Sequence, residues 1–388
     1  MNDRLHIGFL TSEYPHEKAQ HAAGIGTSIK NLVNALRGQD IAVSVFVFGQ
    51  QHDEVLVEDG IKIHLIAQRS YRLATWYQYR KFLQQYLNRV IAADKIDLIE
   101  APDWTGITAF MKINAPLVVR FHGSDAYFCH LEHRKQKMKN FVFEKLGIGK
   151  ADAYIAPTDF AGKISQYIFK IKNKPIQTIH YGLSLEQFQN PEPAQYTKGL
   201  ILYIGTIIRK KGVLELPAIF EKVLADFPEA QLVLIGGDSF DLSTQSTSTW
   251  RLLQHQLSKN AQSKVSYLGK VPYREIQDYI KRANVCVFPT FAETLGMVTI
   301  ESMAMQKAVV NSNIGWAPEL IDDGVNGYLV HPESHDLYAQ RILELLGDNA
   351  LCQTIGSAAR RKTEQKFDIQ QLVRDNIAFY RQVIKDKK

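Results

Sequence analysis

A strand, a loop and a helix follow one another between residues 285 and 311, and this order constrains the fold of the chain more than any other feature. The apolar run 285–288 ends at Pro289, which has no backbone N–H to donate within a sheet. Residues 297–305 then have the apolar spacing of a buried helix, and a second apolar run follows at 308–311. We therefore predict two strands joined by a helix, which is the repeating unit of a parallel sheet.

The start of this helix has the composition of a ligand site. Leu295, Gly296 and Met297 would place backbone amides at the helix N-terminus, where anions bind. Glu293 precedes the helix, and Glu301 lies about one turn beyond Met297 on the same face. Carboxylates suit vicinal hydroxyls, so the pattern favours a nucleotide-sugar, which has a phosphate group between two sugar rings. Alternatively, both glutamates only interact favourably with the helix dipole.

Two further strand ends have residues suited to a phosphate. Gly24 and Gly26 separate a first strand at 5–10 from a helix expected at 27–36, and such glycines let the backbone approach a ligand closely, although they can equally be ordinary turn glycines. Arg209, Lys210 and Lys211 follow another strand, with a glycine on each side. Their charges suit a diphosphate, and a solvated run of surface charge is the alternative.

Three residues of the first half become candidates because ligands of open parallel sheets bind at the carboxyl ends of the strands. Asp103 and Trp104 follow the strand expected at 96–100, and we expect them on the acceptor side of the site. An N-cap Asp beside a packed Trp is the alternative. His122 follows a strand at 116–121 and precedes Gly123, which turns the backbone outward, so we expect a functional rather than a core histidine.

A family resemblance rests on these residues. Glu293 and Glu301, then ESMAMQKAVV and PELIDDGVNGYLV, resemble the signature of the family-4 retaining glycosyltransferases of GT-B fold, also described as glycosyl transferases group 1. The resemblance covers nearly the whole chain. This chain departs from the family pattern at several positions, where the family usually has a different residue, often Gly or Pro. These positions are Ala23, Tyr181, Thr206, Gln306, Ala308 and Trp316.

The resemblance implies an α/β fold with two doubly wound, Rossmann-like domains facing across a cleft. We expect an acceptor-side domain at 1–188, a linker at 189–199, a nucleotide-sugar domain at 200–366, and a terminal helix at 367–388 that returns to the first domain. The resemblance also implies transfer with retention of anomeric configuration. His122 would lie beside the donor sugar, Glu293 would steady its oxocarbenium-like centre, and Glu301 would hold the ribose.

We expect no cofactor and no metal. Asp-x-Asp, the common divalent-cation clamp of other transferases, is absent from the sequence. The helix start at 295–297, together with Arg209, Lys210 and Lys211, can stabilise the leaving diphosphate electrostatically. The leaving phosphate can itself accept the proton of the acceptor, so the scheme does not require a protein base.

The distribution of charged and apolar residues bears on where the protein works and what it binds. The net charge is +6, and residues 130–175 hold ten basic against four acidic side chains, interleaved with Phe141, Phe143, Tyr167, Ile168 and Phe169. This segment could dock on an anionic membrane, or it could be a solvated basic helix face. Nucleic acid is a poor fit, because no binding motif accompanies the basic region.

The remaining patterns favour a cytoplasmic protein. The first residues lack the layout of a signal peptide, and no apolar run approaches the length of a membrane span. Cys129, Cys286 and Cys352 are widely spaced, which indicates reduced packing residues. We expect the protein to work in the cytoplasm, at the inner face of the cell membrane if residues 130–175 dock there.

We conclude that the sequence predicts a retaining hexosyltransferase. The donor would be a nucleotide-diphosphate-sugar, and the acceptor a glycan of the lipid-linked or cell-surface polysaccharide type. Two alternatives stay open: a nucleotide-sugar epimerase of the same fold, and a non-catalytic two-lobed ligand-binding protein.

Overall fold

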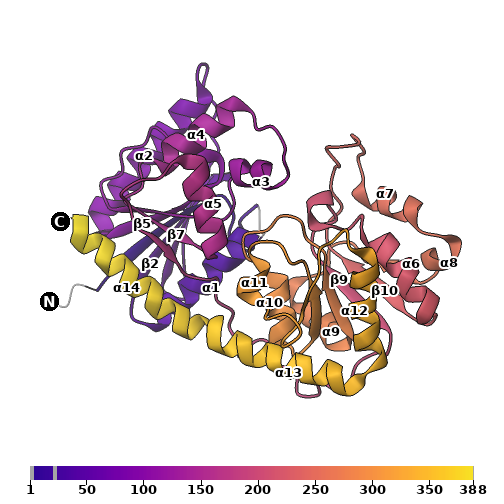
Figure 1. Cartoon of the computed structure of the whole chain (residues 1–388). Helices are drawn as coiled ribbons and strands as arrows, with labels where there is room; N and C mark the ends of the chain where they lie inside the picture. Colours follow the sequence, from indigo (N-terminus) through magenta and orange to yellow (C-terminus); the bar gives the residue numbers. More distant parts are fainter. Residues whose placement is uncertain (1–3, 21–23, 388) are drawn as a thin grey trace. The chain divides into compact units, whose positions relative to one another are not determined.

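The computed structural model describes residues 4–20 and 24–387 and divides into two compact units (Figure 1). Unit 1 comprises residues 1–183 and 369–388, and unit 2 comprises residues 184–368. The chain thus leaves unit 1 at Leu183 and returns to it at Ile369. This boundary precedes the proline-rich stretch 189–199, which the structure groups with unit 2.

Unit 1 is built on a sheet that has eight strands among the described residues, in the order β3-β4-β2-β1-β5-β6-β7-β8. Neighbouring strands are parallel except for β3, which pairs antiparallel with β4 at one edge. Without the edge strands β3 and β8, the order is that of a Rossmann sheet, which reverses between β1 and β5. The bounds are β1 His6–Thr11, β2 Ala42–Gln50, β3 Glu54–Glu58, β4 Ile61–Ala67, β5 Leu98–Pro102, β6 Leu117–Arg120, β7 Ala153–Ala156 and β8 Ile176–Thr178.

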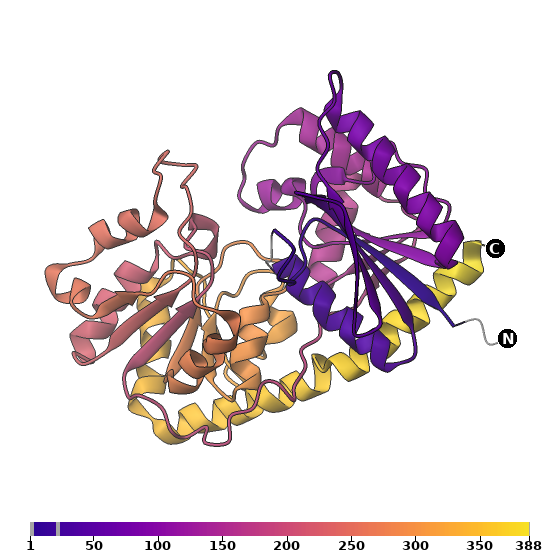
Figure 2. The ribbon, with the colours of Figure 1, turned by 180° about the vertical axis from the view of Figure 1, so that it is seen from behind.

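Helices cover both faces of this sheet, because its central strands are apolar on both sides (Figure 2). One core joins the strands to α1 and α14, and the other joins them mainly to α2. The bounds are α1 Gly24–Gly38, α2 Thr75–Asp94, η1 Trp104–Gly106, α3 Asp125–Leu131, α4 Met138–Ile148, α5 Asp159–Phe169 and α14 Ile369–Lys387. Helix α1 begins three residues before the expected start at Thr27, so Gly24 belongs to the helix and not to a turn.

The long helix α14 joins unit 1 through a buried polar contact as well as through its apolar face. The guanidinium of Arg120 in β6 donates to both carboxylate oxygens of Glu100 in β5, at 2.7 and 2.9 Å, and to Oδ1 of Asn376 in α14 at 2.6 Å. Tyr380 of α14 donates to Glu100 at 2.6 Å. Because all four side chains are buried, this network specifies where α14 docks.

Unit 2 has a parallel sheet with the Rossmann order throughout, β11-β10-β9-β12-β13-β14 among the described residues. The strands are β9 Leu200–Ile204, β10 Gln231–Ile235, β11 Val265–Tyr267, β12 Val285–Phe288, β13 Ala308–Asn311 and β14 Tyr328–Leu329. The helices are η2 Arg209–Lys211, α6 Leu216–Asp226, α7 Thr249–Gln256, α8 Lys259–Gln262, α9 Tyr273–Arg282, α10 Met297–Ala304, α11 Ala317–Leu320, α12 His335–Gly347 and α13 Asn349–Lys366. The order reverses between β9 and β12, so a ligand crevice is expected beyond the carboxyl ends of these two strands.

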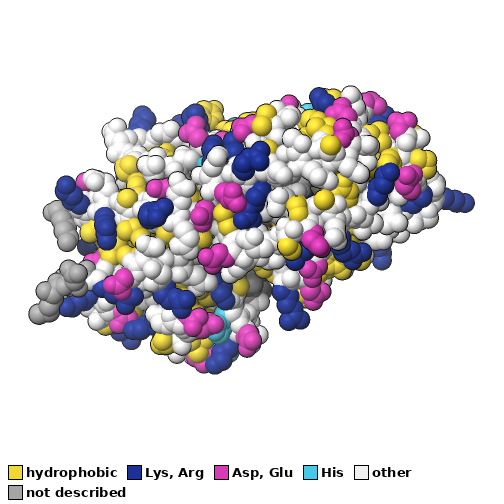
Figure 3. All heavy atoms as spheres, turned by 90° about the horizontal axis from the view of Figure 1, so that it is seen from below, with side chains coloured by type: hydrophobic (Ala, Val, Ile, Leu, Met, Phe, Trp, Pro, Cys, Tyr) yellow, Lys and Arg dark blue, Asp and Glu magenta, His cyan; other side chains and the backbone are white. Residues whose placement is uncertain are grey.

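The surface carries a mixture of charged, polar and apolar side chains. On the face drawn in Figure 3, basic and acidic side chains are interspersed, with scattered hydrophobic atoms between them. Within the described residues, no helix is both long enough and apolar enough to cross a bilayer. All three cysteines are free and buried, as predicted for packing residues.

Candidate active site

The donor-site candidates of unit 2 gather beyond β9 and β12, where the strand order reverses. The turn η2 with Lys210 and Lys211 follows β9, and Glu293 lies between β12 and α10. Both loops leave the carboxyl edge of the sheet, so residues 82 positions apart come into contact. Strand order alone therefore explains why the basic turn and the acidic loop share one site.

A close backbone approach fixes these two loops to each other. Gly212 has φ +69°, and a Cβ atom at this position would lie 1.6 Å from the carbonyl oxygen of Pro289. Only glycine meets both requirements. The carbonyl of Lys210 also accepts the backbone N–H of Phe291 at 2.9 Å. Backbone contacts thus hold the two loops together, independently of the ion pair between their charged side chains.

The central pair of the site is Lys211 and Glu293, whose ammonium and carboxylate groups form an ion pair. Oε1 of Glu293 also accepts the backbone N–H of Thr294 at 3.0 Å. Burial alone would raise the pKa of Glu293, but the charge and hydrogen bond of Lys211, with a contribution from Lys210, hold it below its ordinary value. Glu293 is therefore a carboxylate at neutral pH.

Helix α10 starts beside this pair. Gly296 occupies the N-cap with φ +96°, and within the described parts of the chain no acceptor bonds the N–H groups of Gly296 and Met297. Such free amides are what an anion site at a helix start requires. Leu295 itself is buried, so it contributes its backbone rather than its side chain.

A small cavity at this point includes side chains that the sequence analysis did not select. Lys211, Glu293 and Gly296 line it together with Thr290 and Asn311. Nδ2 of Asn311 donates to Thr299 in α10 at 3.1 Å. Thr290 lies just beyond β12 and Asn311 ends β13, so a polar residue at a strand's carboxyl end is the signal that would have found both.

Glu301 is not among the residues that line this cavity. Its carboxyl group is buried and accepts a hydrogen bond of 2.6 Å from the hydroxyl of Tyr273 in α9. Burial raises the pKa of Glu301 to about 7. Glu301 thus contacts α9 and not the small cavity that Glu293 lines, and its expected role at the ribose stays a prediction.

Arg209 pairs with a carboxylate of unit 2, and its expected role at a diphosphate stays a prediction. Its guanidinium donates to both oxygens of Asp241, with both distances 2.9 Å. This bidentate pair, together with the hydrogen bonds from Thr244, holds the pKa of Asp241 well below its usual range, although burial alone would raise it. Arg209 thus fixes the loop that carries Asp241, and of the three cations predicted for a diphosphate it is the one already engaged in a bidentate carboxylate pair.

In unit 1, His122 lies at the end of β6 and is nearly buried. A hydrogen bond of 2.7 Å joins its Nδ1 to the hydroxyl of Tyr181, and the two rings stack with centroids 5.4 Å apart. Burial, and secondarily the charge of Arg120, lowers the pKa of His122 to about 3. The imidazole is therefore neutral at physiological pH and suited to hydrogen bonding.

Asp103 supports the loop that carries His122. Its carboxylate accepts the N–H groups of His122 at 2.9 Å and Gly123 at 3.3 Å, and it is buried. Burial raises its pKa to about 7. Asp103 thus positions the backbone at His122, and its expected place on the acceptor side stays a prediction. Trp104 is 42% exposed at the start of η1, and its acceptor role stays a prediction.

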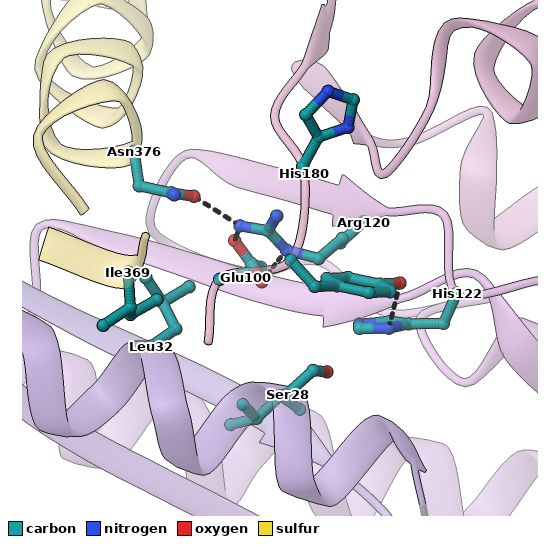
Figure 4. A pocket seen from close by; sticks show the side chains of 11 residues that line it. Ser28, Leu32, Glu100, Arg120, His122, His180, Ile369 and Asn376 are labelled. Carbon is teal, nitrogen blue, oxygen red and sulfur yellow. Dashed lines mark hydrogen bonds and ion pairs between the residues drawn. The ribbon is translucent and has the colours of Figure 1, made fainter. Parts of the chain in front are cut away.

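A second small cavity lies beside His122 within unit 1. Figure 4 shows His122, Arg120 and Glu100 along it, with Ser28 of α1 and Asn376 of α14 on other sides. The sequence analysis missed the Glu100–Arg120 pair, which lies inside strands that read as apolar runs. A charged residue interrupting a buried strand is the signal that could have found it.

The glycines of the first loop have different roles. Gly24 is exposed, and a Cβ atom there would meet nothing within 4 Å. Gly26 is the close-contact position, because a Cβ would lie 3.0 Å from the backbone of Glu13. The structure therefore gives no packing reason for glycine at position 24, and the neighbouring Ala23 lies outside the described residues.

Within residues 4–20 and 24–387, no group of three His, Cys, Asp or Glu side chains could hold a metal ion.

Comparison with known families matches both units. The model of "Glycosyltransferase Family 4" matches residues 22–187, and that of "Glycosyl transferases group 1" matches residues 186–362. Together they span residues 22–362, the first mainly in unit 1 and the second in unit 2. The chain belongs to this glycosyltransferase family.

Solved structures and a curated relative agree with this assignment. The fold of this glycosyltransferase is similar to that of sucrose-phosphate synthase from Thermosynechococcus elongatus, with a TM-score of 0.80 and 20% identity, covering 99% of this chain and 100% of the other. It is also similar to Anabaena Alr3699/HepE in complex with UDP-glucose, with a TM-score of 0.70 and 19% identity over 97% and 100% of the two chains. The capsular polysaccharide biosynthesis glycosyltransferase CapM of Staphylococcus aureus is 27% identical over 53% of this chain and 54% of its own. The GT-B fold class predicted from the sequence is confirmed.

Proposed function

We propose that this glycosyltransferase moves a hexose from a nucleoside-diphosphate sugar to a glycan acceptor, with retention of anomeric configuration. The observation that carries the proposal is the placement of Lys211 and Glu293 at the amino end of α10. A diphosphate would interact with Lys211, Lys210 and the free amides of the helix, while Glu293 would bind the hydroxyls of the sugar. The complex of Alr3699/HepE with UDP-glucose supports a donor of this class.

The proposed chemistry needs negative charge to be stabilised on the leaving diphosphate. Lys211 and the N-terminus of α10 supply positive potential at that position without moving, which is the efficient form of electrostatic catalysis. Glu293, held as a carboxylate, would stabilise the oxocarbenium-like centre, and the leaving phosphate would take the acceptor's proton. We include neutral His122 as a second catalytic residue that hydrogen-bonds the sugar, and we propose that no divalent cation takes part.

The donor is tested by a panel of nucleoside-diphosphate sugars. Calorimetry and turnover of each donor, with wild-type protein and Lys211→Ala, should reveal one preferred donor whose binding needs Lys211. Nuclear magnetic resonance of the product then reports the anomer directly. An inverted product would refute retention, and an isomerised sugar-nucleotide formed without acceptor would indicate an epimerase instead.

We further propose that the acceptor is a lipid-linked or cell-surface glycan, handled at an anionic membrane. The relative CapM, a capsular polysaccharide biosynthesis glycosyltransferase, supports this acceptor class. In α4, Met138, Val142 and Leu146 are spaced by four residues and are 74%, 40% and 39% exposed, so they form an apolar stripe. Exposed lysines accompany this stripe, namely Lys135, Lys137, Lys139, Lys145 and Lys150.

This docking surface differs from the one that the sequence suggested. Tyr167 is 73% exposed, but Phe141 stacks on buried Phe169, and Phe143 packs against Trp76. Phe141 and Phe143 therefore pack α4 against the rest of unit 1, and the aliphatic side chains of α4 face the solvent. Each basic residue near an anionic surface contributes about 1 kcal/mol, so several together with a shallow apolar stripe would give reversible binding.

Vesicle co-sedimentation tests the membrane part. We expect binding to anionic vesicles at low salt, weaker binding at high salt, and loss of binding when Lys135, Lys137 and Lys139 are replaced by Gln. Lys259→Gln, an exposed lysine of unit 2, is the matched control. Binding that these replacements leave unchanged would refute the surface. The acceptor part fails separately if a water-soluble metabolite is glycosylated much faster than lipid-linked sugars.

A further inference from the structure

Unit 2 contains a second cavity, at the edge of the sheet opposite to the Lys211–Glu293 site. Its volume is about 70 Å³, enough for several waters or one small ligand. Lys307, which precedes β13, and Asn284, which precedes β12, line it, whereas Glu293 follows β12. A four-residue strand is about 13 Å long, so the two sites are separate.

Lys307 is the unusual residue of this cavity. Only 2% of the residue is exposed, and its Nζ has no hydrogen-bond partner anywhere in the described chain. The ammonium lies 5.3 Å from the ring centroid of Tyr196, which also lines the cavity. Apart from this ring contact, the ammonium has no hydrogen bond and no counter-ion within the described chain, and such burial of a charge is destabilising, so an anionic partner would stabilise it.

The neighbouring ionisable groups do not compensate the charge. The thiols of Cys286 and Cys352 are the groups whose charges would act on Lys307 within the described structure. Burial raises the pKa of Cys286 to about 11 and also raises that of Cys352, so both thiols are neutral at physiological pH. Protonated Lys307 therefore gives the cavity a positive charge that these thiols do not neutralise, and this charge favours an anion over a cation.

The other polar residues around the cavity are uncharged, and several of them can donate hydrogen bonds. Gln306, Gln353 and Ser357 contribute two amides and a hydroxyl. Gln306 has φ +58°, a left-handed conformation that glycine adopts more easily, by about 1 kcal/mol. The chain thus keeps an amide side chain at a position where local backbone energetics favour glycine, and that side chain lines the cavity.

We propose that this cavity is a binding site for a small oxyanion of the phosphate or short-carboxylate class. Lys307 would neutralise the anion, and the amide of Gln306 with its neighbours would bind the oxygens. The site is distinct from the one proposed for the sugar donor and does not depend on the donor's identity. An anion there would also favour the protonated form of Lys307, whose pKa burial lowers.

Binding is tested with inorganic phosphate and with acetate, against chloride at equal ionic strength. The Lys211→Met background removes the main cation of the proposed donor site. In that background we expect phosphate or acetate to raise the Tm and to give a calorimetric isotherm. The preferred anion distinguishes the phosphate class from the carboxylate class, and no response to either at 10 mM, roughly 1,000 times a tight ligand's Kd, would overturn the proposal.

Two variants assign the response to the cavity. Adding Lys307→Met should weaken anion binding at least tenfold, while the protein without anion stays as stable or becomes more stable, because an unpaired buried charge is removed. Gln306→Gly should fold, since glycine suits φ +58°, and should bind the anion more weakly. Lys198→Met, an exposed lysine of the nearby segment, is the control and should change nothing. Anion binding that survives in both Lys307→Met and Gln306→Gly would refute the site.

Discussion

The hydroxyl of Tyr181 lies 2.7 Å from Nδ1 of His122, and the two rings stack almost parallel, at 13°. The family usually has Asn at the position of Tyr181. The tyrosine stacks on the imidazole ring and also forms a hydrogen bond with its Nδ1. Because the pKa of His122 lies far below 7, this contact fixes the orientation of a neutral ring.

Replacing Tyr181 by Phe should keep the stacking and lose the hydrogen bond. A neutral hydrogen bond is worth about 0.5–1.5 kcal/mol, so we expect kcat to fall about 2- to 12-fold with little change in the KM for the donor. Steady-state kinetics give the two constants, and ¹⁵N spectra of His122 report the tautomer. The exposed Tyr167→Phe is the control, and an unchanged kcat with an unchanged tautomer would contradict the role.

Lys211 and Glu293 should separate binding from turnover. Lys211→Ala should weaken nucleoside-diphosphate binding by about 10- to 100-fold, because a charge-assisted bond contributes about 1.5–3 kcal/mol. Glu293→Gln should instead lower single-turnover rates and leave the affinity for the nucleoside diphosphate within a few-fold of wild type. Calorimetry and rapid quench measure the two effects. Equal losses of affinity in both variants would show that Glu293 binds the nucleotide and not the sugar.

Glu301 should make unit 2 sensitive to pH. Its pKa in the folded state, about 7, lies above the unfolded value near 4.5, so the folded state binds the proton more tightly. The wild type should therefore lose stability as the pH rises from about 5 to about 8, and Glu301→Gln, which can still accept from Tyr273, should remove this cost.

The comparison is a urea titration of both proteins at pH 5 and pH 8. The gain from Glu301→Gln should be about 2–3 kcal/mol larger at pH 8, where the wild-type carboxylate is buried in its charged form. Glu275→Gln, on the exposed side of α9, should show no such difference. A gain of equal size at both pH values would rule out the titration of Glu301 as its cause. Separately, Glu301→Ala should weaken donor binding if this carboxylate holds the ribose.

Arg120 should control the docking of α14. Arg120→Met leaves the carboxylate of Glu100 buried without its guanidinium, which costs about 3–5 kcal/mol. Amide hydrogen exchange in α14 should accelerate, since Asn376 loses its partner as well. Arg374→Met, an exposed arginine of the same helix, is the matched control. Unchanged protection of α14 in Arg120→Met would show that its apolar face suffices to hold it.

Activity should persist in an excess of chelator. Lys210, Lys211 and the start of α10 are proposed to neutralise the leaving group, so added Mg²⁺ or Mn²⁺ should not change the rate. The test is to measure the turnover of chelator-treated enzyme with and without each cation. A rate lost in chelator and restored by a cation would contradict this prediction.

The local elements were predictable because their signals are local. Val285–Phe288 and Met297–Ala304 form the strand and helix expected, since an apolar run ends at Pro289 and a glycine starts the next element. The contact between Lys211 and Glu293 also follows from strand order. These features need only the periodicity of the chain and the rule that ligands bind beyond carboxyl ends.

The side-chain partners were less predictable, because they depend on packing between distant segments. Arg209 contacts Asp241 between two loops, and Glu301 contacts Tyr273 between two helices, and the sequence does not specify how these segments pack. The contact of Arg120 with Asn376 joins residues 256 positions apart. Likewise, the apolar stripe of α4 could not be told from a core face until the packing of Phe141 had fixed which side of the helix is covered.

The return of α14 to unit 1 also sets an order of events during synthesis. The sheet of unit 1 emerges from the ribosome early, but Asn376 and Tyr380, which bond the Glu100–Arg120 pair, follow only after the whole of unit 2. At about 5–20 residues per second, the 185 residues of unit 2, from 184 to 368, impose a delay of about 10–40 s. During that interval the nascent unit 1 lacks the helix that packs on the apolar face of α1 and bonds the Glu100–Arg120 pair, so both are left uncovered until α14 is made.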